Sequence, residues 1–145
     1  MTPFAMYVRV ISKTLQPGEI DVRLGVCADE SYALGSRKHP QSRPFGHTGW
    51  MRHAVAPEPG ARPEDLEPIV LGWGEQFARA LGALTDSGDA EVALVLVQCV
   101  EDLDDEMSKG IVLSARLVAW LAIARAYVDI DQYIFHECEE RATEE

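Results

Sequence analysis

The stretch that decides the fold runs from Gly110 to Phe135 and reads GIVLSARLVAWLAIARAYVDIDQYIF. Its first five residues predict a short strand, the apolar run from Ala115 to Ala126 predicts a mostly buried helix, and Tyr127 to Phe135 predict a long strand. Serine is favoured at helix N-termini, so Ser114 is expected to cap this helix. Because no other part of the chain is as apolar, we expect the core to form around this stretch.

The residues before this stretch alternate between strand and helix patterns. We predict strands over residues 7–15, 32–34, 46–55 and 90–100, and helices over residues 17–25 and 63–85. In the longer helix, apolar residues recur at steps of three and four, while Gly72 and Gly74 indicate either close packing or a bend.

This order of elements predicts the fold class. The first six elements follow the split βαβ order, βαββαβ, of ferredoxin-like folds, and the last stretch adds a βαβ unit. We therefore expect one α+β domain over residues 1–145, with an antiparallel-rich sheet and helices on one face. Residues 6–136 are predicted to form the ordered core, and residues 137–145 an acidic tail.

Length and charge exclude some classes of partner. A chain of 145 residues is long enough for one hydrophobic core. The net charge of −11 argues against nucleic acid, whose binding needs a basic surface, and allows electrostatic steering toward a basic protein partner. The longest apolar run, Leu117 to Ala124, is too short to span a bilayer, and the opening residues lack a signal-peptide pattern. We therefore expect a cytoplasmic protein without a membrane partner.

Motifs for catalysis or cofactor binding are missing from the sequence. The three cysteines, Cys27, Cys99 and Cys138, are widely spaced, which fits neither a disulfide framework nor a zinc site, and we expect the first two in or near the core. The chain has no phosphate-binding glycine loop, no His-Glu-x-x-His and no Gly-x-Ser-x-Gly. No catalytic residue, cofactor or metal is predicted, and the balance favours a protein that is not an enzyme.

A long basic segment is the first candidate site. The twenty-seven residues from Ser31 to Pro57 contain no Asp or Glu. The candidate ligand-binding residues within it are Arg37, His39, Arg43, His47, Trp50, Arg52 and His53. Arginine and histidine side chains of this kind can hold a phosphate or carboxylate. The alternative is a flexible loop whose charge balances an acidic body.

Asp129 and Asp131 form the second candidate site. They stand two residues apart in a predicted strand, so both point to one face, about 7 Å apart. Two like charges cost stability unless a cation, a metal or solvent offsets them, and Arg37, Arg43 and Arg52 are the expected counter-charges. The residues of this strand and the preceding helix that we expect in the core are Leu117, Val118, Leu121, Val128, Ile130 and Ile134.

Four motifs in this order resemble a bacterial family, the domain of unknown function 4279. They are a proline-containing turn leading into Ile20 to Gly25, the pair Gly49-Trp50 after the basic loop, the helix start Leu113-Ser114, and the strand Asp129 to Tyr133. The resemblance covers about Tyr7 to Phe135. It implies a small bacterial cytosolic protein and, for some members, a role as immunity proteins against toxins. It transfers no catalytic residue.

Three functions compete at this point. The first is a non-enzymatic, immunity-like binding protein, whose acidic residues Glu101 to Glu106 and tail meet a basic, toxin-like partner. The second is a domain or hydrolase for a small anionic ligand, with the basic loop over Asp129 and Asp131. The third is a homodimer formed through an edge strand.

Overall fold

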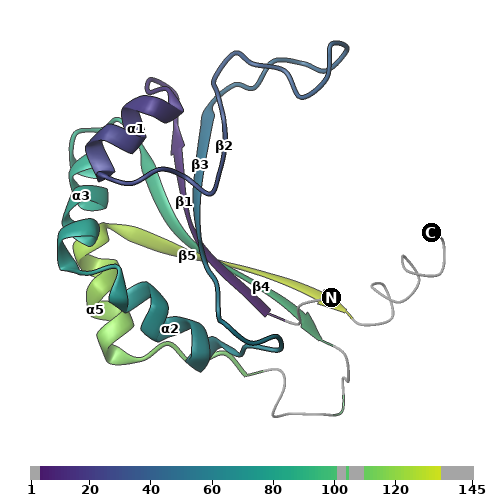
Figure 1. Cartoon of the computed structure of the whole chain (residues 1–145), viewed down its shortest axis with the longest axis vertical. Helices are drawn as coiled ribbons and strands as arrows, with labels where there is room; N and C mark the ends of the chain where they lie inside the picture. The colour runs from purple at the N-terminus through teal and green to yellow at the C-terminus, as the bar shows by residue number, and fades with distance from the viewer. Residues whose placement is uncertain (1–3, 101–103, 105–109, 135–145) are drawn as a thin grey trace.

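The protein forms a five-stranded sheet with its described helices on one side (Figure 1). The computed structural model describes residues 4–100, 104 and 110–134. In chain order the elements are β1 (Phe4–Ser12), α1 (Pro17–Leu24), β2 (Glu30–Tyr32), β3 (Thr48–Ala54), α2 (Pro63–Gly72), α3 (Glu75–Asp86), β4 (Glu91–Val100), α5 (Ala115–Ala124) and β5 (Ala126–Ile134). The predicted acidic loop, apart from Asp104, and the predicted tail lie outside the described residues.

The strand order confirms the predicted α+β fold with an antiparallel-rich sheet. The strands lie in the order β2-β3-β1-β4-β5. The first three pairings in this order are antiparallel, whereas β4 and β5 are parallel. The first four strands thus have the split βαβ arrangement, and α5 is the crossover that places β5 beside β4.

One predicted strand is absent, because residues 110–114 have no regular structure. The backbone N–H of Ser114 donates to Glu67 Oε1 of α2 at 2.7 Å, and Ile111 and Leu113 pack against the core. This segment is therefore apolar because it packs against the core. Since it is not a strand, the first strand of the last βαβ unit is β4. Ser114 caps α5 as predicted, since its Oγ accepts from the Leu117 N–H at 3.2 Å.

The predicted long helix over residues 63–85 is two helices, α2 and α3, separated by a bend at Trp73 and Gly74. Gly74 has φ of +91° and ψ of 165°, an extended conformation with positive φ that is accessible essentially only to glycine. Its carbonyl accepts a hydrogen bond from the Trp120 indole N–H at 3.1 Å. Of the two roles predicted for Gly72 and Gly74, close packing or a bend, the structure shows the bend.

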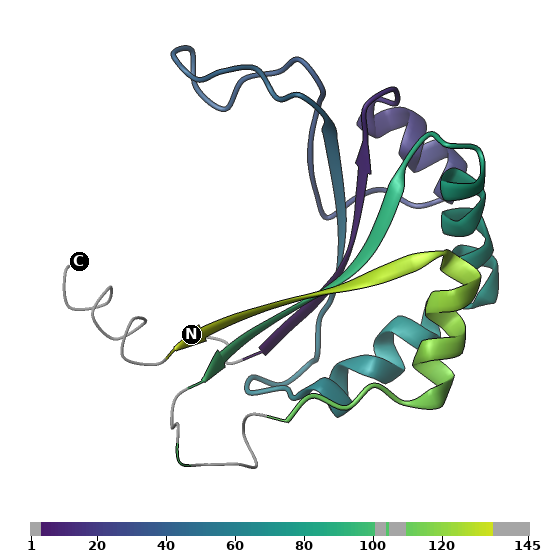
Figure 2. The ribbon, with the colours of Figure 1, turned by 180° about the vertical axis from the view of Figure 1, so that it is seen from behind.

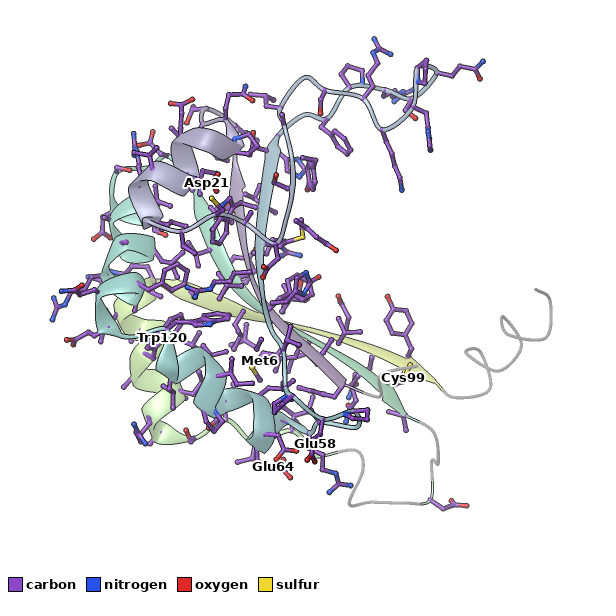
Figure 3. All side chains as sticks on the ribbon, in the orientation of Figure 1. Met6, Asp21, Glu58, Glu64, Cys99 and Trp120 are labelled. Atoms are coloured by element: carbon purple, nitrogen blue, oxygen red, sulfur yellow. The ribbon has the colours of Figure 1, made fainter. Side chains whose placement is uncertain are left out.

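Strand register places alternate residues of every strand against the helices. The even residues of β1, from Phe4 to Val10, are at most 4% exposed. They lie in register with Trp50 and Ala54 of β3 and with Val92, Leu94 and Leu96 of β4. Figure 3 shows Met6 and Trp120 between the sheet and the helices. The core therefore fills the space between this side of the sheet and the helix layer.

Two residues predicted in the core are largely exposed. Leu117 and Leu121 are buried as predicted, but Val118 is 53% exposed on the outer side of α5. Ile130 is 47% exposed although its register position faces the helix side, because β5 is an edge strand that the helix layer covers only in part. Val128 is half-buried, and the side chain of Ile134 lies outside the described residues.

The cysteines differ from the prediction as well. Cys27 is exposed, because it lies in the surface segment that follows α1, and Cys99 is half-buried.

The most apolar helix, α5, has ten residues, about half of what a bilayer requires. Among the described residues, no helix is both long and apolar enough to cross a membrane.

Candidate functional site

The side of the sheet opposite the helices, here called the open face, has no described helix over it (Figure 2). Strand register fixes which residues belong to it. They are Glu30 and Tyr32 of β2; Gly49, Met51 and His53 of β3; Ala5, Tyr7, Arg9 and Ile11 of β1; Glu91, Ala93, Val95, Val97 and Cys99 of β4; and Tyr127, Asp129, Asp131 and Tyr133 of β5. Aromatic and charged side chains thus lie among aliphatic residues on this face, and the tyrosines and aspartates concentrate on β5.

All four tyrosines of the chain lie on the open face: Tyr7, Tyr32, Tyr127 and Tyr133. Tyr127 is 46% exposed and Tyr133 is 38% exposed, while the other two are half-buried. A tyrosine offers an apolar ring and a hydroxyl group together, and it is enriched where one protein contacts another. The open face therefore has the composition of a contact surface.

Arg9 connects the middle of the open face to β5. Its Nη2 donates to the Tyr127 hydroxyl and to Asp129 Oδ2, each at 3.2 Å, across the small side chain of Ala93. Burial by itself lowers the Arg9 pKa, but the hydrogen bonds to Tyr127 and Asp129 outweigh it, and the net shift is upward. Asp129 is therefore paired with a residue that the sequence reasoning missed, and the expected pairing with Arg37, Arg43 or Arg52 is wrong.

Several carboxylates accompany Arg9 on this face. Asp131 is exposed and, within the described part of the chain, forms no salt bridge. Burial is the main reason why the pKa of the Tyr7 phenol is raised, and Arg9 opposes the rise. Asp131, Asp129 and Glu30 raise this pKa further. Three carboxylates and one guanidinium therefore lie close enough to Tyr7 to affect its pKa, and Arg9 has the largest single charge effect.

His53 extends the open face toward β2. Its ring lies 4.9 Å from the Tyr7 ring, and its Nε2 is 3.6 Å from a Glu30 carboxylate oxygen. Its backbone N–H donates to Asp29 Oδ2 at 2.8 Å, which fixes the strand at this point. His53 is the residue of the predicted basic site whose register position belongs to the open face.

Trp50 and Arg52 lie on the helix side, away from Asp129 and Asp131. Trp50 is fully buried, and its indole N–H donates to Asp21 Oδ1 at 2.7 Å. The Arg52 guanidinium lies 4.4 Å from the Trp73 ring centre and 4.7 Å from that of Phe77. Burial lowers its pKa, and Asp29 opposes this effect. Both residues support the core.

The remaining basic candidates lie in an arm formed by residues 33–47, which projects from the junction of β2 and β3 (Figure 1). Gly35 and Phe45 bond across the arm, with Gly35 N donating to Phe45 O at 2.9 Å, and Arg37 donates to the Ser42 carbonyl at 2.6 Å. His39 and Arg43 are exposed. Because β2 and β5 are opposite edges of the sheet, the arm does not cover Asp129 and Asp131.

Tyr32 fastens the arm to the open face. Its ring lies 4.4 Å from the Phe45 ring, and its hydroxyl is 2.8 Å from His47 Nε2. The ring also covers Gly49, where an added Cβ would overlap it. Glycine at position 49 therefore allows a tyrosine to lie flat on β3, and this role explains the Gly-Trp pair better than ligand binding does.

The described residues contain no group of three or more His, Cys, Asp or Glu side chains that would hold a metal ion. A family model described as a domain of unknown function, DUF4279, matches residues 2–135. No curated protein and no solved structure matches the chain. The matched range includes every described strand and helix.

Proposed function

This chain belongs to the DUF4279 family, and we propose that it acts as an interaction protein whose open face binds a basic protein partner. The observation that carries the proposal is the set of four tyrosines, interspersed with carboxylates, on a sheet face without a described helix over it. Tyrosine rings attract arginine and lysine through their π faces, and carboxylates pair with the same groups.

The size and charge of the open face support this function. The strands β1, β4 and β5 have nine or ten residues each, so they are about 30 Å long. Five strands side by side give a width of roughly 20 Å, and the resulting area approaches the ~800 Å² per partner of a standard interface. The net charge of −11 speeds the encounter with a basic partner.

The finer proposal is an immunity-like role, in which the partner is a toxin with a basic surface. Its support is the acidity of the chain together with the family resemblance. Toxin neutralisation requires a tight, partner-specific contact and no chemistry, and a rigid sheet loses little entropy when it binds.

The proposal is tested by affinity capture from the native host. The bait proteins are the wild-type chain, a double variant Asp129→Asn/Asp131→Asn, and a charge-matched control, Glu64→Gln/Glu75→Gln, with both changes on exposed helix residues. We expect wild type and control to retain one basic protein, and the open-face variant to lose it at least tenfold. Equal retention by all three baits, or capture of nothing specific, contradicts the proposal.

A second candidate function has one observation in its favour. At the base of the arm, an open recess is lined by Ser31, Tyr32, Ser36, Arg37, Lys38 and Phe45. Two cations and two serine hydroxyls fit a small anion. An anion held there at 100 times its Kd would raise the unfolding free energy by about 2.7 kcal/mol. Thermal shifts with phosphate and nucleotides, compared between wild type and Arg37→Ala/Lys38→Ala, decide this candidate.

A further inference from the structure

Strand β5 is the outer strand at one edge of the sheet. It pairs along all nine of its residues with β4, and the described strands provide no neighbour on its other side (Figures 1 and 2). The N–H and C=O groups that point away from β4 form a row of hydrogen-bonding sites. The strand contains no proline and no lysine, the residues that commonly protect an edge.

The side chains of β5 present different chemistry on its two faces. On the open face lie Asp129 and Asp131, flanked by Tyr127 and Tyr133. On the helix side lies Ile130, 47% exposed at a position where its neighbour in β4, Leu96, is fully buried. A strand placed beside β5 would therefore meet two carboxylates on one face and an uncovered aliphatic side chain on the other.

We propose that β5 binds an extended strand of the basic partner, which adds to the sheet as a sixth strand. This inference rests on the proposed function and specifies the segment that the open face recognises. Alternate lysine or arginine residues of the added strand face Asp129 and Asp131, and the intervening apolar residues cover Ile130. Main-chain hydrogen bonds supply affinity in this mode, and the alternating side chains supply specificity.

Charge selects this occupant over a second copy of the chain. When two β5 strands pair antiparallel along all nine residues, the pairing is centred on Ile130. Asp129 of each copy then stands opposite Asp131 of the other, and like charges directly opposite each other are destabilising. The same carboxylates that oppose self-association favour a basic strand, and the sequence after β5 is also acidic.

The test uses the full-length chain and synthetic peptides. The probe is a capped heptapeptide, Thr-Lys-Val-Lys-Val-Lys-Thr, together with two versions that are N-methylated at the lysines or at the valines. In an added strand, the N–H groups of alternate residues point toward β5. We expect one methylated version to lose at least tenfold in affinity and the other to keep it, as measured by fluorescence anisotropy. Amide hydrogen exchange should slow at alternate residues of β5 when the parent peptide binds.

The outcomes separate this inference from the proposed function. If both methylated peptides bind like the parent, or no peptide binds, strand addition is overturned, while capture with the native partner still decides the proposed function. If Asp129→Asn/Asp131→Asn leaves the affinity of the parent peptide unchanged, the assigned recognition by charge is wrong. A solution mass of twice the monomer that the peptide does not alter identifies a second copy as the occupant and also overturns the inference.

Discussion

The two faces of the sheet divide the aromatic residues between them. The three tryptophans lie on the helix side, and the four tyrosines lie on the open face. Two of the indole N–H groups have a protein acceptor, Asp21 Oδ1 for Trp50 and the Gly74 carbonyl for Trp120. One acceptor satisfies an indole, so a tryptophan can be buried, whereas a phenol both donates and accepts and is easily satisfied near water. One face thus contributes mainly to stability, and the other is available for contacts.

Some residues of the open face are nevertheless buried. Ala93 and Val95 belong to it by register, yet they are 1% and 0% exposed. In register, Arg9 lies beside Ala93 and Tyr7 lies beside Val95. The long side chains of the face therefore contribute some stability of their own.

The largest expected difference between the faces comes from removing one aromatic ring from each. Trp50→Ala should lower the unfolding free energy by about 3–5 kcal/mol, because a fully buried ring leaves a cavity. Tyr127→Ala should cost about 1 kcal/mol or less, since the ring is 46% exposed. Urea unfolding measures both values. Similar losses would show that the two faces are energetically alike.

The bend that supports the helix side gives the next largest effect. Gly74→Ala places a Cβ on a residue with φ of +91° and ψ of 165°, which should cost about 1–3 kcal/mol. Gly72→Ala is the matched control, because this residue is helical and exposed, with open space at its Cβ position. The control should be neutral or stabilise by up to about 1 kcal/mol. Equal thermal unfolding temperatures for the two variants would contradict the role of the bend.

On the open face, the Arg9–Asp129 pair should contribute less. Both side chains are partly exposed, so a double-mutant cycle with Arg9→Met and Asp129→Asn should give a coupling of about 0.2–1 kcal/mol that decreases with salt. Methionine keeps the apolar cover over Ala93. A coupling that salt does not change would indicate that the pair is more deeply buried than its geometry shows.

The smallest effect is a pH dependence at the alkaline side. The folded-state pKa of Tyr7 is raised above its ordinary value near 10, chiefly by burial. The stability from its neutral form is therefore complete below pH 10 and is lost as the pH rises through the folded-state pKa. Tyr7→Phe should lose less stability than wild type as the pH rises above about 10. Parallel stability curves over this range would contradict the assignment.

The sequence predicts the fold class and the order of most elements, but not which side chains meet across the sheet. Alternation predicts β1, and a β-branched run predicts β4. The Ser114 cap and the helix end at Gly25 are local signals that the structure confirms. The pairing of Arg9 with Asp129 depends on strand order, since the two residues are 120 positions apart and two strands away from each other. No local pattern contains that information, although the place of Arg9 between inward-facing valines marks it as an outward residue.

The basic segment misled the prediction for a physical reason. Its missing acids suggested one positively charged site, but its residues are divided among three environments. Alternation along β3 sends Arg52 to the aromatic rings of the core and His53 to the open face, and the tight turns of the arm hold Arg37 against its own backbone. Composition reports the charge of a segment, whereas the strand pleat decides where each charge points.

The position of Tyr32 on Gly49 has a mechanical consequence. The Tyr32 ring contacts Phe45 and His47 of the arm, and it also lies against Gly49 of β3. The arm is therefore connected to the sheet through this ring. A pull on the arm must either slide this ring across the strand or transmit the force to β3. A displacement of the arm that keeps the Tyr32 contacts therefore also displaces β3.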